Sequence, residues 1–248
     1  MKPLRLSKSG IGAFTQCPKK YYFQYVERKR MAPNALMTMG KNLHEKYESF
    51  YNKLPEDTKN INQIWQVFQD CCLPENTEQE KGHLANFLEM NLTTFEDLKK
   101  QGNTKDFAPI AVEQKYYDEE KDFVGVIDAV FKSGDKVLVV DWKSSLYKEG
   151  KESGYRFELA GYKHLWDLNH LDEPATHWGI FFTGNGVFWV EECKEISSKA
   201  FYKKLERTRE RINECYKTGN WEKGNNSMCQ WCGYFADCWE EELNEGGI

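Results

Sequence analysis

The segment Val137-Leu-Val-Val-Asp141-Trp-Lys143 has the character of a buried strand. Four consecutive apolar residues are typical of a strand that is covered on both faces of a sheet. Because side chains alternate between the two faces of a strand, Asp141 and Lys143 are expected on the same face, where the strand ends. The segment therefore predicts an acid and a base next to each other at the end of a core strand.

Two more strands are predicted before this one, so that residues 110–117, 123–132 and 136–142 form a three-strand meander. Ser133-Gly-Asp135 supplies turn residues between the last two strands. The middle strand contains Gly125-Val-Ile-Asp128, an apolar run with a single carboxylate, and a buried acid needs a partner or a metal. If the strands pair across the turn, Asp128 and Asp141 lie close together and repel each other unless a cation is bound.

The remaining elements surround this meander with helices. Ser7 is expected to cap a helix through Cys17, and helical patterns cover residues 40–53, 62–72, 78–100, 155–169 and 197–217. Two further strands are expected at residues 177–183 and 187–191, joined through Thr183-Gly-Asn-Gly186. We expect an α/β (α+β) fold in one domain, residues 1–248, with a mostly helical part (1–108), a catalytic sheet core (109–192) and a C-terminal helix with a cysteine cluster (193–248).

Composition limits the class of protein without deciding it. The 248-residue chain is 40% hydrophobic with a net charge of −5, so charge alone does not favour nucleic-acid binding, although a basic groove remains compatible with that total. The longest apolar runs are too short to cross a bilayer and the N-terminus has no secretory pattern, which predicts a cytoplasmic protein without membrane contact. Eight cysteines in such a chain favour reduced thiols or metal ligands over disulfides.

The carboxylates and the lysine suit phosphodiester hydrolysis. That reaction needs a divalent metal to hold the phosphate and activate water, together with positive charge for the transition state. Carboxylate oxygens at Asp128 and Asp141 suit magnesium or manganese, and Lys143 could orient the water or neutralise charge. A D-x-K tripeptide alone is a weak signal, because a surface ion pair looks the same and is the commoner explanation, so Asp128 carries much of the argument.

The order of these residues resembles the RecB-type branch of the PD-(D/E)XK nucleases. That branch has a histidine on an early helix, then a G-x-x-D strand, a D/E-x-K strand and a Q-x-x-x-Y helix, which His44, Asp128, Asp141 with Lys143, and Tyr162 match here. The resemblance implies a restriction-endonuclease-like mixed sheet and a metal-dependent DNA nuclease, an exonuclease or DNA-end-processing enzyme. It also implies that His44, Asp128 and Asp141 bind the metal and that Lys143 assists catalysis.

Two positions near this set have less certain roles. Glu113 matches an acidic position that precedes the G-x-x-D strand in similar enzymes, but an exposed strand glutamate explains it equally well. Glu158 departs from the family pattern, which has glutamine there, and a carboxylate would repel phosphate. Glu158 and Tyr162 are four residues apart and share a helix face, so Tyr162 stays a candidate while the role of Glu158 is in doubt.

The C-terminal segment contains Cys229, Cys232 and Cys238 in a C-x2-C-x5-C pattern, three soft ligands in ten residues. With Cys17, in Phe14-Thr-Gln-Cys-Pro-Lys-Lys-Tyr-Tyr22, the pattern resembles AddB-related nucleases and the CRISPR adaptation exonucleases. That resemblance implies that the four cysteines hold a [4Fe–4S] cluster that joins the chain ends. Zinc is the rival occupant, since four thiolates also form structural zinc sites.

DNA, single-stranded or with free ends, is the expected partner, and protein partners in a DNA-processing complex stay open. Basic residues at 19–20 and 27–30 flank the aromatic run Tyr21 to Tyr25, which offers either a stacking surface for a single strand or core packing around the cysteines. The basic stretch at 203–211 is interleaved with acids and reads as a solvated helix face. The alternatives are a DNA-binding accessory protein without turnover and an iron–sulfur redox sensor.

Overall fold

The structure is a computed structural model that describes residues 5–55, 57–73, 76–224, 227 and 229–238. The chain forms two compact units. One unit contains Met1–Pro33, Glu119–Val124 and Tyr202–Ile248, and the other contains Asn34–Asp118 and Gly125–Phe201. Each is described by itself below.

The larger unit, residues 34–118 and 125–201, opens with three amphipathic helices. These are α3 (Ala35–Lys53), α4 (Ile61–Cys72) and α5 (Glu78–Lys100). Asn34 caps α3 through the Met37 N–H, and both α4 and α5 begin with complete capping boxes at Asn60 and Thr77. The three predicted helices are therefore confirmed, with α3 beginning five residues earlier than its predicted start at Gly40.

The sheet has six strands: β1 (Leu6–Ser7), β2 (Ala111–Asp118), β3 (Phe123–Ser133), β4 (Lys136–Lys143), β5 (His177–Phe182) and β6 (Val187–Glu192). Their order is β1-β3-β4-β5-β6, and β2 also pairs with β3. β4 is antiparallel to β3 and parallel to β5, so the sheet is mixed. This architecture confirms the predicted mixed α/β fold of the restriction-endonuclease type.

The β3–β4 hairpin sets the register on which the candidate site depends. Ser133 pairs with Lys136 across a two-residue turn, and Gly134 there has a φ of +56°, a conformation that glycine adopts without steric cost. From this turn the pairs run without interruption to Ala129 opposite Val140. Asp128 therefore lies one residue beyond the last pair, next to the end of β4.

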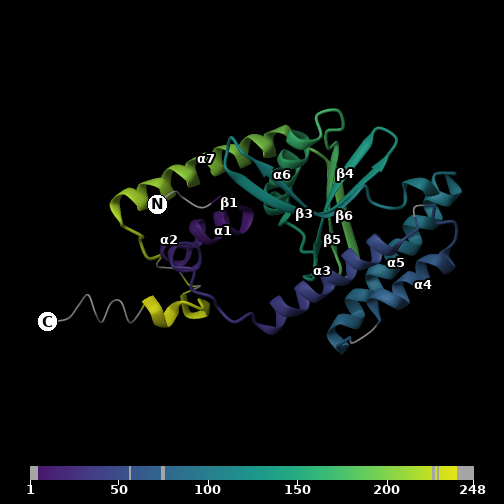
Figure 1. Ribbon diagram of the computed structural model, residues 1–248, viewed down its shortest axis with the longest axis horizontal. Helices are drawn as coiled ribbons and strands as arrows, with labels where there is room; N and C mark the ends of the chain where they lie inside the picture. The colour runs from purple at the N-terminus through teal and green to yellow at the C-terminus, as the bar shows by residue number, and fades with distance from the viewer. Residues whose placement is uncertain (1–4, 56, 74–75, 225–226, 228, 239–248) are drawn as a thin grey trace. The chain divides into compact units, whose positions relative to one another are not determined.

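Helices cover both faces of the sheet in the larger unit. The α3–α5 helices share one apolar core with Val140 and Trp142 of β4. Asp141 and Lys143 alternate with Trp142, and Lys143 pairs with Glu158 of α6 (Glu152–Asn169). Figure 1 shows α6 and the α3–α5 group on opposite sides of the strands.

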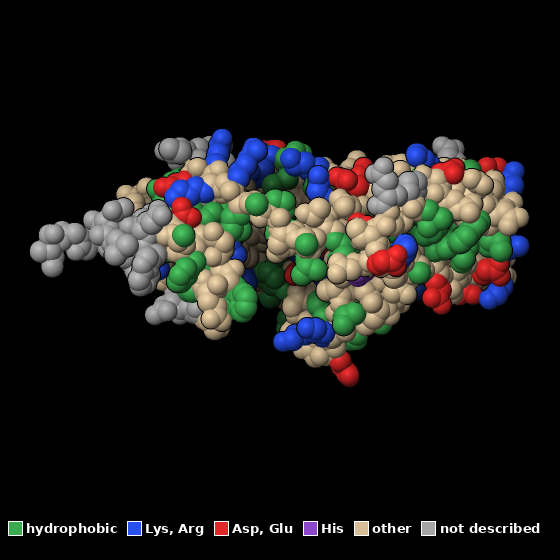
Figure 2. All heavy atoms as spheres, turned by 90° about the horizontal axis from the view of Figure 1, so that it is seen from below, with side chains coloured by type: hydrophobic (Ala, Val, Ile, Leu, Met, Phe, Trp, Pro, Cys, Tyr) green, Lys and Arg blue, Asp and Glu red, His purple; other side chains and the backbone are tan. Residues whose placement is uncertain are grey.

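Part of the outer surface of these helices remains apolar. Ile61 and Trp65 on α4, and Leu73 directly after it, are between 42% and 47% exposed. Figure 2 shows hydrophobic side chains gathered on the face over its right-hand end, where α4 and α5 lie in Figure 1.

The smaller unit contains β1, α1 (Lys8–Gln16), α2 (Pro18–Tyr21), the π-helix η1 (Tyr22–Val26), most of α7 (Glu195–Thr218) and the 3-10 helix η3 (Cys229–Trp231). The Ser7 hydroxyl accepts from the Gly10 N–H and so caps α1, as predicted. β1 was not predicted. It pairs in parallel with the first residues of β3, Leu6 opposite Phe123, although its two residues are too few to give a periodic pattern.

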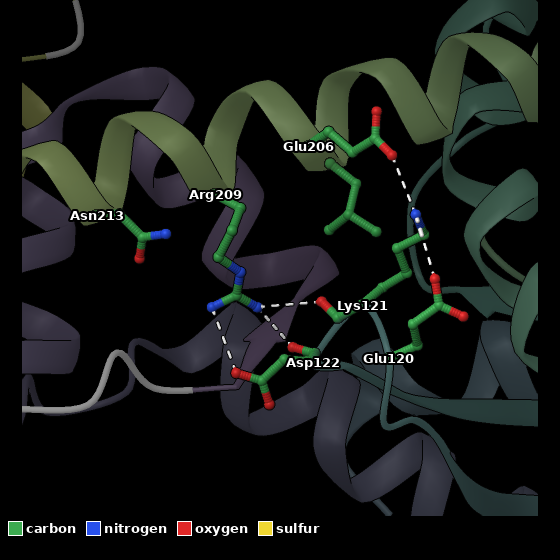
Figure 3. Close-up of a pocket in the computed structure, with 7 residues that line it drawn as sticks. Glu120, Lys121, Asp122, Glu206, Arg209 and Asn213 are labelled. Carbon is green, nitrogen blue, oxygen red and sulfur yellow. Dashed lines mark hydrogen bonds and ion pairs between the residues drawn. The ribbon is translucent and has the colours of Figure 1, made fainter.

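The predicted solvated face of α7 is wrong at Arg209. Figure 3 shows this guanidinium pointing from α7 to the segment before β3, where it donates to the backbone carbonyls of Lys121 and Asp122. Lys121 in turn pairs with Glu206 one turn earlier on α7. The charged lining of this hollow of about 330 Å³ thus fixes α7 to the β2–β3 connection within the smaller unit.

No helix among the described residues is both long enough and apolar enough to cross a membrane.

Candidate active site

Two buried carboxylates lie at the end of the β3–β4 hairpin. Asp128 is 6% exposed and Asp141 is 4% exposed, and both belong to strands whose neighbouring residues are apolar. The Trp142 N–H donates to Asp128 Oδ2 at 2.7 Å, which fixes this carboxylate against the end of β4. The expected proximity of the two acids agrees with this register.

His44 reaches the carboxylates from α3. Its Nδ1 lies 3.0 Å from Glu113 Oε1 and 3.8 Å from Asp128 Oδ1. Its Nε2 lies 3.0 Å from the Trp142 carbonyl oxygen. Burial opposes protonation of the ring, but the hydrogen bond to Glu113 and the charges of Asp128 and Glu113 outweigh it and raise the pKa of His44 to about 9.

Glu113 joins this group from β2 and has an unusual backbone conformation. Within β2 it has a φ of +45°, a left-handed conformation that costs a non-glycine residue about 1–2 kcal/mol. Its side chain is 19% exposed and contacts His44. Of the two readings of Glu113, the exposed strand residue is therefore wrong, and strain is retained where the carboxylate meets the histidine.

Lys143 lies between two carboxylates. Its Nζ is 2.9 Å from Asp141 Oδ2 and 2.8 Å from Glu158 Oε2. The D-x-K pair is thus a half-buried ion pair at the end of a core strand, with Lys143 only 23% exposed. The unexpected glutamate at position 158 has a concrete role here, since it holds the lysine from the α6 side.

Tyr162 lies one helical turn after Glu158 and packs over β3 at Gly125. A Cβ at Gly125 would lie 2.7 Å from Leu165 Cδ1 and 3.5 Å from the Tyr162 ring, so the glycine of the G-x-x-D segment allows α6 to approach. Tyr162 is 8% exposed, and burial followed by the charges of Asp141 and Asp128 raises its pKa well above the ordinary value. Its hydroxyl therefore stays protonated at neutral pH, close to the carboxylates.

The electrostatics of the group suit a divalent cation. Burial, and then the charge of Asp141, raise the pKa of Asp128 to about 7, because several acids converge on one buried position. Among the described parts of the chain, His44, Glu113 and Asp128 are a set of potential ligands whose ligand atoms lie within 4.8 Å of one another. The hard carboxylate oxygens suit magnesium and manganese, and the imidazole adds one softer nitrogen donor.

The four predicted cluster cysteines belong to the smaller unit and are all half-buried. Cys17 Sγ accepts from the Gly224 N–H at 3.1 Å, and Cys229 Sγ contacts the Gly224 carbonyl oxygen at 3.0 Å. A Cβ at Gly224 would lie 2.8 Å from the Gln16 carbonyl oxygen, so glycine permits this approach of the two chain ends. Cys17 and Cys229 therefore both contact Gly224.

All eight cysteines are described, and each is a free thiol in the structure. Burial raises the pKa of Cys72 and Cys193 to about 12 and also raises that of Cys215. These three thiols stay protonated and behave as packed apolar groups. Cys71 is half-buried, and its thiol contacts the Ser49 carbonyl oxygen.

Comparison with known proteins agrees with this geometry. The sequence model of the PD-(D/E)XK nuclease superfamily matches residues 5–238. The chain belongs to this superfamily. A crystal structure described as a "putative exonuclease" from Eubacterium rectale resembles this PD-(D/E)XK protein, with a TM-score of 0.54 and 12% identity over 91% of this chain and 86% of that one. A search of curated proteins found no match.

One element of the site was missed at the level of sequence. The peptide groups on both sides of Trp142 contact two predicted ligands, since its N–H donates to Asp128 and its carbonyl faces His44. Every residue has the same backbone groups, so the amino-acid sequence does not reveal these contacts. From the sequence, Trp142 appears only as an apolar residue between Asp141 and Lys143. The Trp142 ring packs between Tyr51 and Tyr47 and fixes the peptide in place.

Proposed function

We propose that this PD-(D/E)XK protein is a magnesium- or manganese-dependent deoxyribonuclease that degrades or processes DNA from its ends. His44, Asp128 and Asp141 hold the cation, and Glu113 supports it. The observation that carries the proposal is the convergence of His44, Glu113 and Asp128 on one position, next to the buried Asp141 and its Lys143 partner. Buried carboxylates this close together are stabilised by a bound cation, and DNA hydrolysis needs a divalent cation next to the scissile phosphate.

Each residue has a defined task in this proposal. When bound, Mg²⁺ or Mn²⁺ supplies Lewis acidity to the scissile phosphate and lowers the pKa of the attacking water. The carboxylates of Asp128 and Asp141 bind the cation, and His44 completes the set with Nδ1, which faces Glu113 and Asp128. The Lys143 ammonium, next to Asp141, orients the attacking water and offsets charge on the phosphate in the transition state.

Two residues of α6 complete the surroundings of Lys143. Glu158 Oε2 lies 2.8 Å from the Lys143 ammonium and accepts from it. Tyr162 keeps its proton, so its hydroxyl acts as a donor near the carboxylates or the phosphate. Glu158 is thus compatible with an active nuclease, although its charge opposes the approach of DNA.

We further propose that Cys17, Cys229, Cys232 and Cys238 hold a [4Fe–4S] cluster with a structural role. Supporting this, Cys17 and Cys229 meet at Gly224 although they are 212 positions apart in the sequence. Four thiolates in a half-buried setting suit either the cluster or zinc, and a distant single cysteine plus a local trio favours the cluster. Metal binding there would stabilise the contact between the chain ends.

The nuclease proposal is tested with anaerobically purified protein, manganese, and two single-stranded DNAs of equal length, one linear and end-labelled and one covalently closed. We expect degradation of the linear strand alone, abolished in Asp141→Ala and retained in Asp135→Ala, which alters an exposed acid of the β3–β4 turn. Cleavage of the closed circle would contradict the requirement for ends. Absence of cleavage with both DNAs would contradict nuclease activity and favour the DNA-binding accessory protein.

The cluster is tested by the visible spectrum and by the iron, sulfide and zinc contents of the same preparation. Four iron and four sulfide per chain are expected, with loss of both in Cys17→Ser. Stoichiometric zinc without sulfide would contradict the cluster and leave the nuclease proposal intact.

A further inference from the structure

The aromatic run from Tyr21 to Tyr25 does not offer the stacking surface that its composition permits. Tyr21 is 1% exposed and Phe23 is fully buried. Tyr21 stacks on Tyr25 and Trp221, and the Phe23 ring lies 5.5 Å from that of Tyr234. Of the two interpretations of this run, core packing is therefore confirmed for Tyr21 and Phe23. Neither ring is accessible to a ligand.

Such rings are present in the cysteine segment itself. Trp231, between Cys229 and Cys232, is 77% exposed, and Phe235, between Cys232 and Cys238, is 50% exposed. Tryptophan is usually well covered in a folded protein, so a ring this exposed is informative. Both rings stand on hydrogen-bonded turns, since the Cys232 N–H donates to the Cys229 carbonyl oxygen and the Phe235 N–H donates to the Cys232 carbonyl oxygen.

The basic segment around Lys29 packs against the cysteine segment 229–238. The Tyr234 hydroxyl donates to the Lys29 carbonyl oxygen at 2.9 Å, and Lys29 pairs with Asp237 at 2.7 Å. The Met31 thioether lies directly over Gly233, where a Cβ could not fit. Residues 29–32 and the Gly233–Asp237 segment together line an open hollow of about 460 Å³.

The basic charge of this surface comes from the segment 19–31, whereas residues 229–238 contribute one acid, Asp237, and no lysine or arginine. Residues 19–31 contain five lysines and arginines and one acid, although the protein carries a net charge of −5. Arg28 and Arg30 are exposed, and Arg28 has a φ of +57°, which marks a sharp turn at the start of the basic segment. An anionic ligand with flat apolar groups is complementary to such a surface.

We infer that Trp231, Phe235, Arg28 and Arg30 of the smaller unit form a binding surface for single-stranded DNA. Bases would stack on Trp231 and Phe235 while Arg28 and Arg30 contact phosphates, the combination that binds single strands without sequence preference. Lys29 holds the two segments together through Asp237 instead. This inference rests on the proposed function for the choice of DNA. Exposed rings beside arginines favour a nucleic acid over an acidic peptide, which would not use the flat rings in this way.

The test measures binding without cleavage, by fluorescence anisotropy of a labelled 15-nucleotide oligothymidylate with the full-length holoprotein in EDTA. Trp231→Ala is expected to weaken binding about tenfold, in line with the loss of one stacked base, and Trp231→Phe to restore part of it. The matched control is Trp65→Ala, which removes an exposed tryptophan of α4 in the larger unit and leaves the affinity unchanged. Equal affinity of Trp231→Ala and the wild type would overturn the inference.

Three controls distinguish a DNA-binding surface from a misfolded segment, a membrane-binding surface and a part of the nuclease site. Unchanged metal content and circular dichroism in Trp231→Ala exclude a collapsed cysteine segment, so reduced binding by this folded variant supports the surface. Binding to vesicles of anionic phospholipid that depends on Trp231, without binding to the oligonucleotide, would overturn the DNA assignment in favour of a membrane surface. Wild-type DNA binding that depends on Trp231 without any manganese-dependent cleavage would refute the nuclease proposal and leave this inference standing.

Discussion

His44 Nε2 lies 3.0 Å from the carbonyl oxygen of Trp142, the residue between Asp141 and Lys143. A carbonyl oxygen only accepts hydrogen bonds, so this contact places a proton on Nε2 and turns Nδ1 toward Glu113 and Asp128. Backbone contacts of this kind orient metal-binding histidines and fix their tautomer. β4, which contains Asp141 and Lys143, therefore also fixes the orientation of the His44 ring.

Replacement of His44 tests its role as a ligand. His44→Ala should weaken manganese binding at least about tenfold, because it removes one donor of the group, and isothermal titration calorimetry without DNA measures this directly. His177→Ala is the matched control, since His177 lies at the start of β5 and bonds to Thr176. Equal manganese affinity in His44→Ala and the wild type would exclude His44 from the metal site.

The strained backbone of Glu113 leads to a prediction in two parts. Glu113→Gly and Glu113→Ala both remove the carboxylate and should reduce manganese affinity equally. Glycine tolerates a φ of +45° whereas alanine does not, so urea unfolding should show Glu113→Gly about 1 kcal/mol more stable than Glu113→Ala. The opposite order of stability would show that this backbone conformation is not strained.

Local sequence patterns are enough to predict the fold and the positions of Asp128, Asp141 and Lys143. Alternation along β4 predicts the shared face of Asp141 and Lys143, and the turn at Gly134 predicts the nearness of Asp128, because both depend on residues close in sequence. The left-handed Glu113 depends instead on its contact with His44, 69 positions away. A backbone that tertiary contacts hold in an unfavourable conformation leaves no periodic signal.

The same limit explains the aromatic residues and α7. Residue type does not reveal exposure, so the Tyr21–Tyr25 run and Trp231 look alike in sequence, although Tyr21 and Phe23 lie in the core and Trp231 lies on the surface. Arg209 likewise resembles its charged neighbours until its two backbone acceptors at Lys121 and Asp122 are brought to it by the fold.

Glu158→Gln should increase nuclease activity. The glutamine oxygen can still accept from Lys143, while the loss of one negative charge near the phosphate should lower KM about fivefold at low salt. Steady-state kinetics over a range of salt concentrations measure the effect, which should shrink as salt rises. Glu152→Gln, in the first turn of the same helix, serves as the control, and a higher KM in Glu158→Gln than in the wild type would assign the carboxylate a direct catalytic role.

The stability of the larger unit should depend on pH through Glu191. Burial opposes ionisation of this group, but hydrogen bonds from Arg156, Lys194 and Trp178 outweigh it and lower the pKa of Glu191 to about 2. Its contribution is therefore complete above the ordinary carboxylate pKa of about 4.5 and is lost as the pH falls toward 2.

Glu191→Gln should accordingly lower the free energy of unfolding by about 1 kcal/mol at pH 7, a value reduced for the partial exposure of the pair, and by progressively less below pH 4.5. Urea unfolding of the wild type, Glu191→Gln and the exposed neighbour variant Glu192→Gln at several pH values measures the difference. A constant difference from pH 7 to pH 2.5 would show that ionisation of Glu191 does not stabilise the fold.

The central claim is that the buried carboxylates hold the cation that cleaves DNA, and Asp128→Asn tests it most directly. Asparagine keeps the shape of the side chain and an oxygen that can accept from the Trp142 N–H, so the fold should be preserved while the charge is lost. The measurement is the single-turnover rate of manganese-dependent cleavage of an end-labelled single strand. We predict a fall of at least about a hundredfold relative to the wild type. A rate within twofold of the wild type would contradict the account.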